Sequence, residues 1–315
     1  MTQTTTAATS TRAGHEPRPR RRGNVGRARR ERTAWLFMTP SIVIIAAFML
    51  WPLVQSAYLS FTEYNRIQAA RWVGWRNYVE LVQDEQVWNA LGNTAVYAVV
   101  VTPVTVVLAL LFAIFLNRQM VGRSFVRTAI FLPFIVSMAI ISFAWTFLLD
   151  ANIGLITYWL SQVGIVTEQG WLTDPQLAMP AVMVVGVWKS VGFYMVMYLA
   201  GLQSIPTDLY EAARVDGAGP WNRFRHITWP LLANQTMLVS IMAAIATIQV
   251  FDQIYVMTRG GPFFSTETLV MLIYRVGFQD LQLGYGAAVS WVLMILVFVL
   301  SMLQYGYFRR RAVTY

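Results

Sequence analysis

The sequence contains no cysteine and little charge for its length. Its 315 residues include two histidines, and only 12% are charged. Without cysteine, the chain can form neither a disulfide framework nor a thiolate metal site. A soluble domain normally carries about 25% charged residues. The shortage of charge therefore argues against a soluble globular protein.

Residues typical of catalytic sites are also sparse. His15 lies near the N-terminus, His226 stands alone, and no long apolar run carries paired carboxylates or a cluster of metal ligands. Residues 186–190 come nearest to a phosphate-binding loop, but such a loop needs glycine directly before the lysine, where this chain has Trp188. We therefore expect no catalytic residue, no metal site, no cofactor and no ATPase activity in the chain itself.

Long charge-free runs are abundant instead, in a chain that is 57% hydrophobic. A helix needs about 20 mainly apolar residues to cross a bilayer. Six runs qualify, and the first is too long to be the core of a signal peptide. They are residues 33–62, 86–117, 128–149, 175–207, 227–251 and 281–308. The runs lack the short alternation of barrel strands. The sequence therefore predicts an all-α membrane protein with six transmembrane helices.

The basic residues predict how these helices are oriented. Nine of the 24 lysines and arginines lie in residues 12–32, so the net charge of +9 belongs to one tail and we expect no nucleic-acid partner. Arginines also gather at residues 118–127, 214–225 and 309–311. Short basic loops stay in the cytoplasm, so both termini should be cytoplasmic. The expected organisation is a disordered tail (1–32), a transmembrane domain (33–311) and a C-terminal tail (312–315).

The most informative stretch is residues 204–230, between the fourth and fifth runs. Pro206 and Pro220 each suit the start of a helix, and Gly217 can adopt the left-handed conformation that ends one. Small residues would let this corner approach another surface closely. Its apolar anchors would be Leu209, Tyr210, Trp221 and Phe224. Two interpretations fit: a docking knob for a partner protein, or an amphipathic helix lying on lipid headgroups.

The same stretch resembles a known family. Glu211-Ala212-Ala213, Asp216-Gly217-Ala218 and the run from Phe224 to Pro230 are similar to the cytoplasmic signature loop of ABC importer permeases of the maltose and glycerol-3-phosphate type. The chain departs from the family pattern at Trp229, where a leucine is usual. Similar segments recur in order at residues 73–78, 127–133, 171–175, 201–206, 258–262 and 284–288. The stretch 251–262 most resembles the first of the two permeases in such systems.

This resemblance implies a type I ABC importer permease fold in a bacterial inner membrane. The chain would pair with a second permease to form the path for a carbohydrate-like solute. A dimer of ATPase subunits and an extracytoplasmic solute-binding protein would complete the importer. The coupling helix that meets the ATPase would comprise Glu211, Ala212, Ala213, Asp216, Gly217, Ala218 and Phe224. In an external turn of flexible glycines and a fixed proline, Gly260, Gly261 and Pro262 would contact the binding protein.

Polar residues within the apolar runs are candidates for the solute path. Lys189 is the only charge in any run, and it is either functional or a snorkelling or locally paired structural lysine. Gln249 and Asp252 are three residues apart and would share a helix face. The resemblance places Gln249 near a position that contacts sugar. Amides, carboxylates and aromatic faces suit a sugar site. The aromatic candidates are Tyr194, Tyr198 and Trp291, each of which could equally be a helix or lipid contact.

An autonomous six-span secondary transporter or channel is the alternative function. Such a protein would need no coupling helix, and we would expect internal repeats or broken helices in it.

Overall fold

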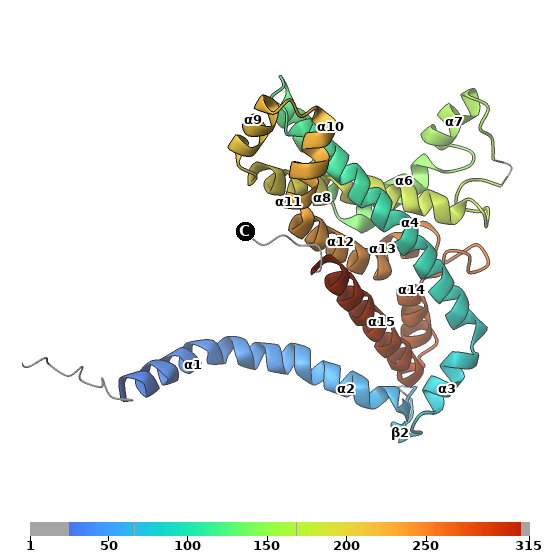
Figure 1. The fold of residues 1–315 in the computed structure, drawn as a ribbon. Coiled ribbons are helices and arrows are strands. Elements are labelled where there is room, and N and C mark those ends of the chain that lie inside the picture. The colour runs from blue at the N-terminus through green and yellow to red at the C-terminus, as the bar shows by residue number, and fades with distance from the viewer. Residues whose placement is uncertain (1–24, 66, 168, 310–315) are drawn as a thin grey trace, which may run out of the picture. The chain divides into compact units, whose positions relative to one another are not determined.

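The structure is a computed structural model that describes residues 25–65, 67–167 and 169–309, with side chains from Arg32 onward. It is almost entirely helical (Figure 1). The chain divides into two units, residues 1–55 and 56–315, each described by itself. The helices are α1 (Val25–Ile45), α2 (Trp51–Ser60), α3 (Arg76–Gln83), α4 (Glu85–Leu116), α5 (Arg123–Ile135), α6 (Met138–Leu148), α7 (Leu155–Gln162), α8 (Ala178–Gln203), α9 (Thr207–Val215), α10 (Pro220–Arg223), α11 (Trp229–Leu231), α12 (Ala233–Ile248), α13 (Asp252–Met257), α14 (Leu269–Tyr274) and α15 (Leu283–Arg309).

Three π-helical turns and one small sheet complete the list of elements. The turns are η1 (Ala46–Leu50), η2 (Phe224–Thr228) and η3 (Arg275–Gln279), and the antiparallel strands are β1 (Thr62–Glu63) and β2 (Arg71–Trp72). Both η1 and η2 lie just before a proline, Pro52 or Pro230. A proline ring clashes with the carbonyl four residues earlier, and a wider turn relieves that clash.

Five helices among the described residues are long and apolar enough to cross a membrane, and one bent pair supplies a sixth span. The single helices are Arg32–Ser60, Glu85–Leu116, Ala178–Gln203, Ala233–Met257 and Leu283–Arg309, and the pair is α5 with α6. With the pair counted as one span, the predicted six transmembrane helices are confirmed.

The ends of the chain differ from the expected organisation where they can be compared. Helix α1 begins at Val25, so residues 25–32 are helical and not part of a disordered tail. Residues 1–24 lie outside the described residues. The predicted C-terminal tail, residues 312–315, lies outside them too.

The third apolar run was predicted as one helix and is two. Helix α5 ends at Ile135, α6 begins at Met138, and the two are bent by 99°. Val136 between them is extended, with ψ at 142°. Pro133, in the last turn of α5, cannot donate a helical hydrogen bond, which weakens the helix near its end. Hydropathy indicated the length of this run but not its bend.

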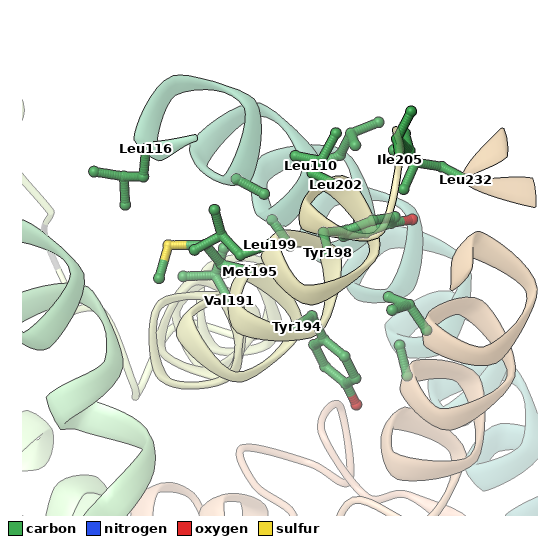
Figure 2. Packing of buried hydrophobic residues seen from close by; sticks show 14 residues of the cluster. Leu110, Leu116, Val191, Tyr194, Met195, Tyr198, Leu199, Leu202, Ile205 and Leu232 are labelled. Atoms are coloured by element: carbon green, nitrogen blue, oxygen red, sulfur yellow. The ribbon is translucent and has the colours of Figure 1, made fainter. Parts of the chain in front are cut away.

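Helix α4 is the centre of the larger unit and packs along α8 and α12. Its Ala109 and Ala113 are fully buried, and such small side chains let helices approach closely. At Gly192, α8 crosses α5 so closely that a Cβ would overlap the carbonyl oxygen of Ile130. Figure 2 shows the α4–α8 core, the buried cluster between these helices and α12 that includes Leu116 and Tyr198.

The bundle has two distinct ends. At the arginine-rich end lie residues 117–122 and the segment 204–232, both next to the α4–α8 core. Toward the opposite end lie the sheet, α3 and the turn that precedes α14, together with the start of α4 (Figure 1). The two sets of loops that matter for function are thus on different sides of the spans.

Candidate functional site

The segment between α8 and α12 folds as a sharp helix corner (residues 207–218). Gly217 has φ at +75°, as predicted for a glycine that ends a helix. Its N–H bonds the carbonyl of Arg214 at 3.1 Å, and the N–H of Ala218 bonds the carbonyl of Ala213 at 2.8 Å. This is the hydrogen-bond pattern of a Schellman motif. Pro220 is the first residue of α10, again as predicted.

The outward face of the corner is small, polar and open. Glu211, Ala212, Asp216 and Gly217 are exposed, whereas Ala213, Ala218 and Phe224 are half-buried. A Cβ built at Gly217 or Gly219 would meet no atom within 4 Å. The carboxylate of Glu211 forms no ion pair with any described residue. The six small or acidic residues of the predicted coupling helix are therefore accessible to a partner in whole or in part.

The apolar anchors predicted for the corner divide into two pairs. Leu209 and Trp221 are 42% and 67% exposed and are available for docking. Tyr210 instead packs on the α4–α8 core, with its Oη 2.9 Å from Oγ1 of Thr228 in η2. Phe224 lies half-buried with its ring centroid 5.6 Å from that of Trp221. Tyr210 therefore joins the corner to the bundle and is not free to act as the docking anchor that the sequence suggested.

A cavity of about 610 Å³ lies between the corner and the end of α4. Three arginines line it, Arg118, Arg214 and Arg223, and none of them forms an ion pair with a described residue. Glu211 lines the same cavity, so these four side chains carry a net charge of +2.

Lys189 of α8 lies where the bent third span crosses that helix. Its Nζ donates to the carbonyl oxygen of Phe134 at 3.4 Å. The same Nζ lies 5.1 Å from the centroid of the Phe134 ring. Phe134 is in the last turn of α5, where carbonyls lack helical partners and a positive charge is favourable. Lys189 therefore has a local partner, as expected of a structural lysine. Its side chain is also half-exposed, so it remains accessible to a solute.

The fifth span breaks where the candidate solute residues lie. Helix α12 ends at Ile248 and α13 begins at Asp252, with Phe251 outside the helical region at φ −138° and ψ −62°. Gln249 and Asp252 therefore do not share a helix face, and that prediction is wrong because it assumed an unbroken helix. Both side chains are exposed.

A buried polar contact next to this break joins two spans. Nε2 of Gln253 in α13 donates to Oη of Tyr97 in α4, and the two residues are 2% and 3% exposed. Gly186 of α8 lies against this pair, so closely that a Cβ there would overlap the tyrosine oxygen. Neither residue was among the candidates predicted for the solute path. Gln253 lies two residues beyond the fifth apolar run (227–251), and nothing in the sequence identifies its partner.

The aromatic candidates lie in different surroundings. Tyr194 is 6% exposed, and its ring points away from the rest of the α4–α8 core in Figure 2. Its ring centroid lies 5.2 Å from that of Phe193, and the Phe193 ring stacks on the Phe134 ring with the centroids 4.5 Å apart. Tyr198 is fully buried, so in this conformation it is a helix contact, one of the two roles left open for it, and cannot meet a solute. Trp291 of α15 is half-buried and makes no ring contact or hydrogen bond to another candidate among the described residues.

At the opposite end, the glycine turn (residues 258–268) connects α13 to α14. Gly260 is buried with φ at +84°, and Gly261 and Pro262 are half-buried. The hydroxyl of Thr266 donates to the carbonyl of Gly261 at 2.8 Å. The turn is therefore internally hydrogen-bonded, in contrast to the flexible segment that its glycines predicted.

Comparisons with known proteins agree with this geometry. The family model described as "binding-protein-dependent transport system inner membrane component" matches residues 85–313. The chain is 38% identical over 282 residues to the lactose transport system permease protein LacF of Rhizobium radiobacter, covering 88% of this chain and 94% of the relative. It is 34% identical over 279 residues to the sn-glycerol-3-phosphate transport system permease protein UgpA of Agrobacterium fabrum, covering 88% and 94%.

The fold is also found in a solved structure. A chain of a bacterial alginate ABC transporter, crystallised in complex with an alginate pentasaccharide-bound periplasmic protein, has a TM-score of 0.80 and 23% identity, covering 92% of this chain and 98% of that chain. At that identity the likeness shows the all-helical permease fold. The resemblance inferred from residues 204–230 is confirmed. The chain belongs to the family of binding-protein-dependent transport system inner membrane components.

Proposed function

We propose that this chain is one of two permease subunits of an ABC importer for a sugar or sugar-like solute, driven by ATP hydrolysis on separate subunits. The observation that carries the proposal is the exposed helix corner, residues 207–218, in a chain of a binding-protein-dependent transport family. The names of similar permeases, which refer to lactose and to sn-glycerol-3-phosphate, support a polyhydroxylated solute.

In this proposal the corner is the coupling helix. Its small side chains allow a cleft of the ATPase to close around it, and Glu211 and Asp216 supply exposed charge for orientation. The Schellman motif at Gly217 keeps the corner rigid. The bond between Tyr210 and Thr228 links it to η2, which leads directly into the fifth span. Movement of the ATPase is thereby transmitted to the helix that carries the solute candidates.

The solute path is assigned to the region around the break in the fifth span. Gln249 and Asp252 offer an amide and a carboxylate, and Lys189 offers an ammonium group. Hydroxyl groups of a sugar need such donors and acceptors, and aromatic faces suit its C–H surface. Tyr194 and Trp291 are the aromatic members of this assignment. The second permease would complete the path.

The arginine-rich end is assigned to the cytoplasm of a bacterial cell, with the protein in the inner membrane. Arg118, Arg214 and Arg223 lie in short segments at this end, and basic residues in short loops remain on the cytoplasmic side. With an even number of spans, both termini would also be cytoplasmic. The glycine turn would then face the binding protein through Gly260, Gly261 and Pro262.

The alternative of an autonomous transporter or channel has less support. We had expected broken helices in that class, yet α5 and α6 are a bent pair in a chain of a binding-protein-dependent family. A broken span therefore does not discriminate between the two functions here. The accessible corner does favour coupling, because an autonomous transporter has no use for it.

Reconstitution tests the proposal. Proteoliposomes containing this chain, its second permease and the ATPase subunits should take up labelled sugar only with internal ATP and external binding protein. Uptake by this chain alone would contradict the proposal. Orientation can be tested because the natural chain has no cysteine. Gly219→Cys should react with a membrane-impermeant maleimide only from the cytoplasmic side, and Gln279→Cys only from outside.

A further inference from the structure

One aromatic side chain at the tip of the glycine turn is almost completely free. Phe263 is 90% exposed, so its ring packs against little of the described structure. Its φ is +49°, and that of Phe264 is +59°. Bulky residues rarely adopt this left-handed conformation, and it persists only where the surrounding structure holds it. The turn therefore holds Phe263 in an outward position at an energetic disadvantage.

The first turns of α4 hold the backbone of this tip. Side-chain amides of Asn89 and Asn93 both donate to the carbonyl of Phe264, each at 3.0 Å. Asn93 donates to the carbonyl of Glu267 as well, also at 3.0 Å. Three side-chain hydrogen bonds from one helix thus fix the residues that follow Phe263.

A buried ion pair holds the other side of the tip. Arg275 donates to both carboxylate oxygens of Glu267, from Nε at 2.7 Å and from Nη2 at 3.0 Å, and the Glu267 side chain is only 1% exposed. Arg275 also donates to Oε1 of Gln86 at 2.9 Å and lies 5.1 Å from the ring centroid of Phe264. Bidentate pairs of this kind are strong and directional. The ring of Phe264 is thereby in contact with Arg275, whereas the ring of Phe263 is exposed.

The position of the tip indicates which phase it faces. Asn89 and Asn93 are the last side-chain amides of α4 before its long apolar stretch, which starts at Ala95. The tip bonded to these asparagines therefore lies at the edge of the hydrocarbon layer, at the end of the bundle opposite to the corner. Exposed Arg259 flanks it. An exposed aromatic side chain on a backbone that is held in place is typical of an interface anchor for a protein.

We propose that Phe263 is the anchor that the extracytoplasmic binding protein buries when it docks, and that the Glu267–Arg275 pair positions it. The inference rests on the proposed importer function and adds the residue that makes the contact. Because the backbone of the tip is already held in place, docking costs little backbone conformational entropy, and such an anchor adds affinity efficiently. Phe263 makes the contact with the binding protein, and the Glu267–Arg275 pair affects docking only by positioning Phe263.

The test uses the complete importer in nanodiscs, titrated with its purified, solute-loaded binding protein. Phe263→Ala should raise the binding-protein concentration for half-maximal ATPase stimulation about tenfold, with the maximal rate unchanged. Phe263→Leu should retain most of the affinity. Phe278→Ala is the matched control, because Phe278 is 65% exposed on η3 at the same end of the bundle. An unchanged half-maximal concentration in Phe263→Ala would overturn the inference.

Glu267→Gln tests the positioning role. In the natural sequence, it should raise the binding-protein concentration needed for half-maximal ATPase stimulation. In the Phe263→Ala variant, it should raise that concentration little further. A general structural defect would raise it by the same factor in both. A photoreactive phenylalanine at position 263 should crosslink to the binding protein, and crosslinking to lipid instead would also overturn the inference. If binding protein fails to stimulate even the unaltered importer, the proposed function fails. If stimulation is normal and Phe263→Ala matches it, only the anchor is wrong.

Discussion

Gln253 donates a hydrogen bond to Tyr97 in the interior of the bundle and so joins α13 to α4 on one side of the break in the fifth span. On the other side, Oγ1 of Thr102 and Oγ1 of Thr247 lie 2.7 Å apart and join α4 to α12. Residues 249–251 are thus held between two polar contacts to the same helix. Since polar groups within a bundle pair with one another, these contacts define the shape of the break.

Tyr97→Phe should destabilise the protein, because it leaves the buried amide of Gln253 without a partner. A buried polar group that loses its partner costs about 1–3 kcal/mol. Thermal unfolding of the purified protein in detergent should show a lower Tm. Adding Gln253→Leu should recover part of the loss, since both polar groups are then gone. If Tyr97→Phe alone has the same Tm as the unaltered protein, the hydrogen bond contributes nothing to stability.

Gly217→Ala should impair coupling, because φ at +75° is unfavourable for any residue with a Cβ. The left-handed conformation costs about 1–2 kcal/mol for an L-residue. Uptake and binding-protein-stimulated ATPase activity should both fall, with an unchanged amount of protein in the membrane. Gly219→Ala is the control, because Gly219 has φ at −67° and open space around it. Equal effects of the two substitutions would refute a conformational role for Gly217.

Glu211→Gln should reduce import about fivefold or more, the effect of losing an interface contact worth over 1 kcal/mol. The carboxylate is exposed and forms no ion pair with a described residue, so the folded chain alone should be unaffected. Asp208→Asn, on the same helix and equally exposed, should import normally. The readout is solute uptake relative to the assembled complex recovered by size-exclusion chromatography. Loss of assembly would also support docking, whereas normal import with normal assembly would rule it out.

Gln249→Ala should raise the KM for solute uptake about tenfold if its amide pairs with a solute hydroxyl, since an unpaired polar group in a site costs about 1–3 kcal/mol. The maximal rate should change less. Gln279→Ala removes an exposed amide at the opposite end from the corner and should leave both constants unchanged. Uptake kinetics in proteoliposomes provide the comparison. An unchanged KM in Gln249→Ala would place the solute elsewhere.

Local features of the protein were readable from consecutive residues. The left-handed Gly217 and the helix start at Pro220 follow from the backbone chemistry of those two residue types, which hardly depends on distant parts of the chain. The six apolar runs follow from the thickness of the bilayer in the same way. Because the helix corner combines these local rules, its shape could be predicted before any tertiary contact was known. The family was inferred separately, from the resemblance of residues 204–230 to a known loop.

Relationships between distant residues were decided only by the tertiary structure. Gln253 and Tyr97 are 156 positions apart, and no periodicity in either helix relates them. The separation of Gln249 from Asp252 depends likewise on packing at the break, which overrides the regular helix that apolar composition favours. Hydropathy describes how each segment interacts with lipid, whereas pairing among buried polar groups depends on which segments meet. The positions of the spans can therefore be predicted from the sequence, because each span must match the membrane. The geometry around the break in the fifth span cannot, because it depends on contacts between spans.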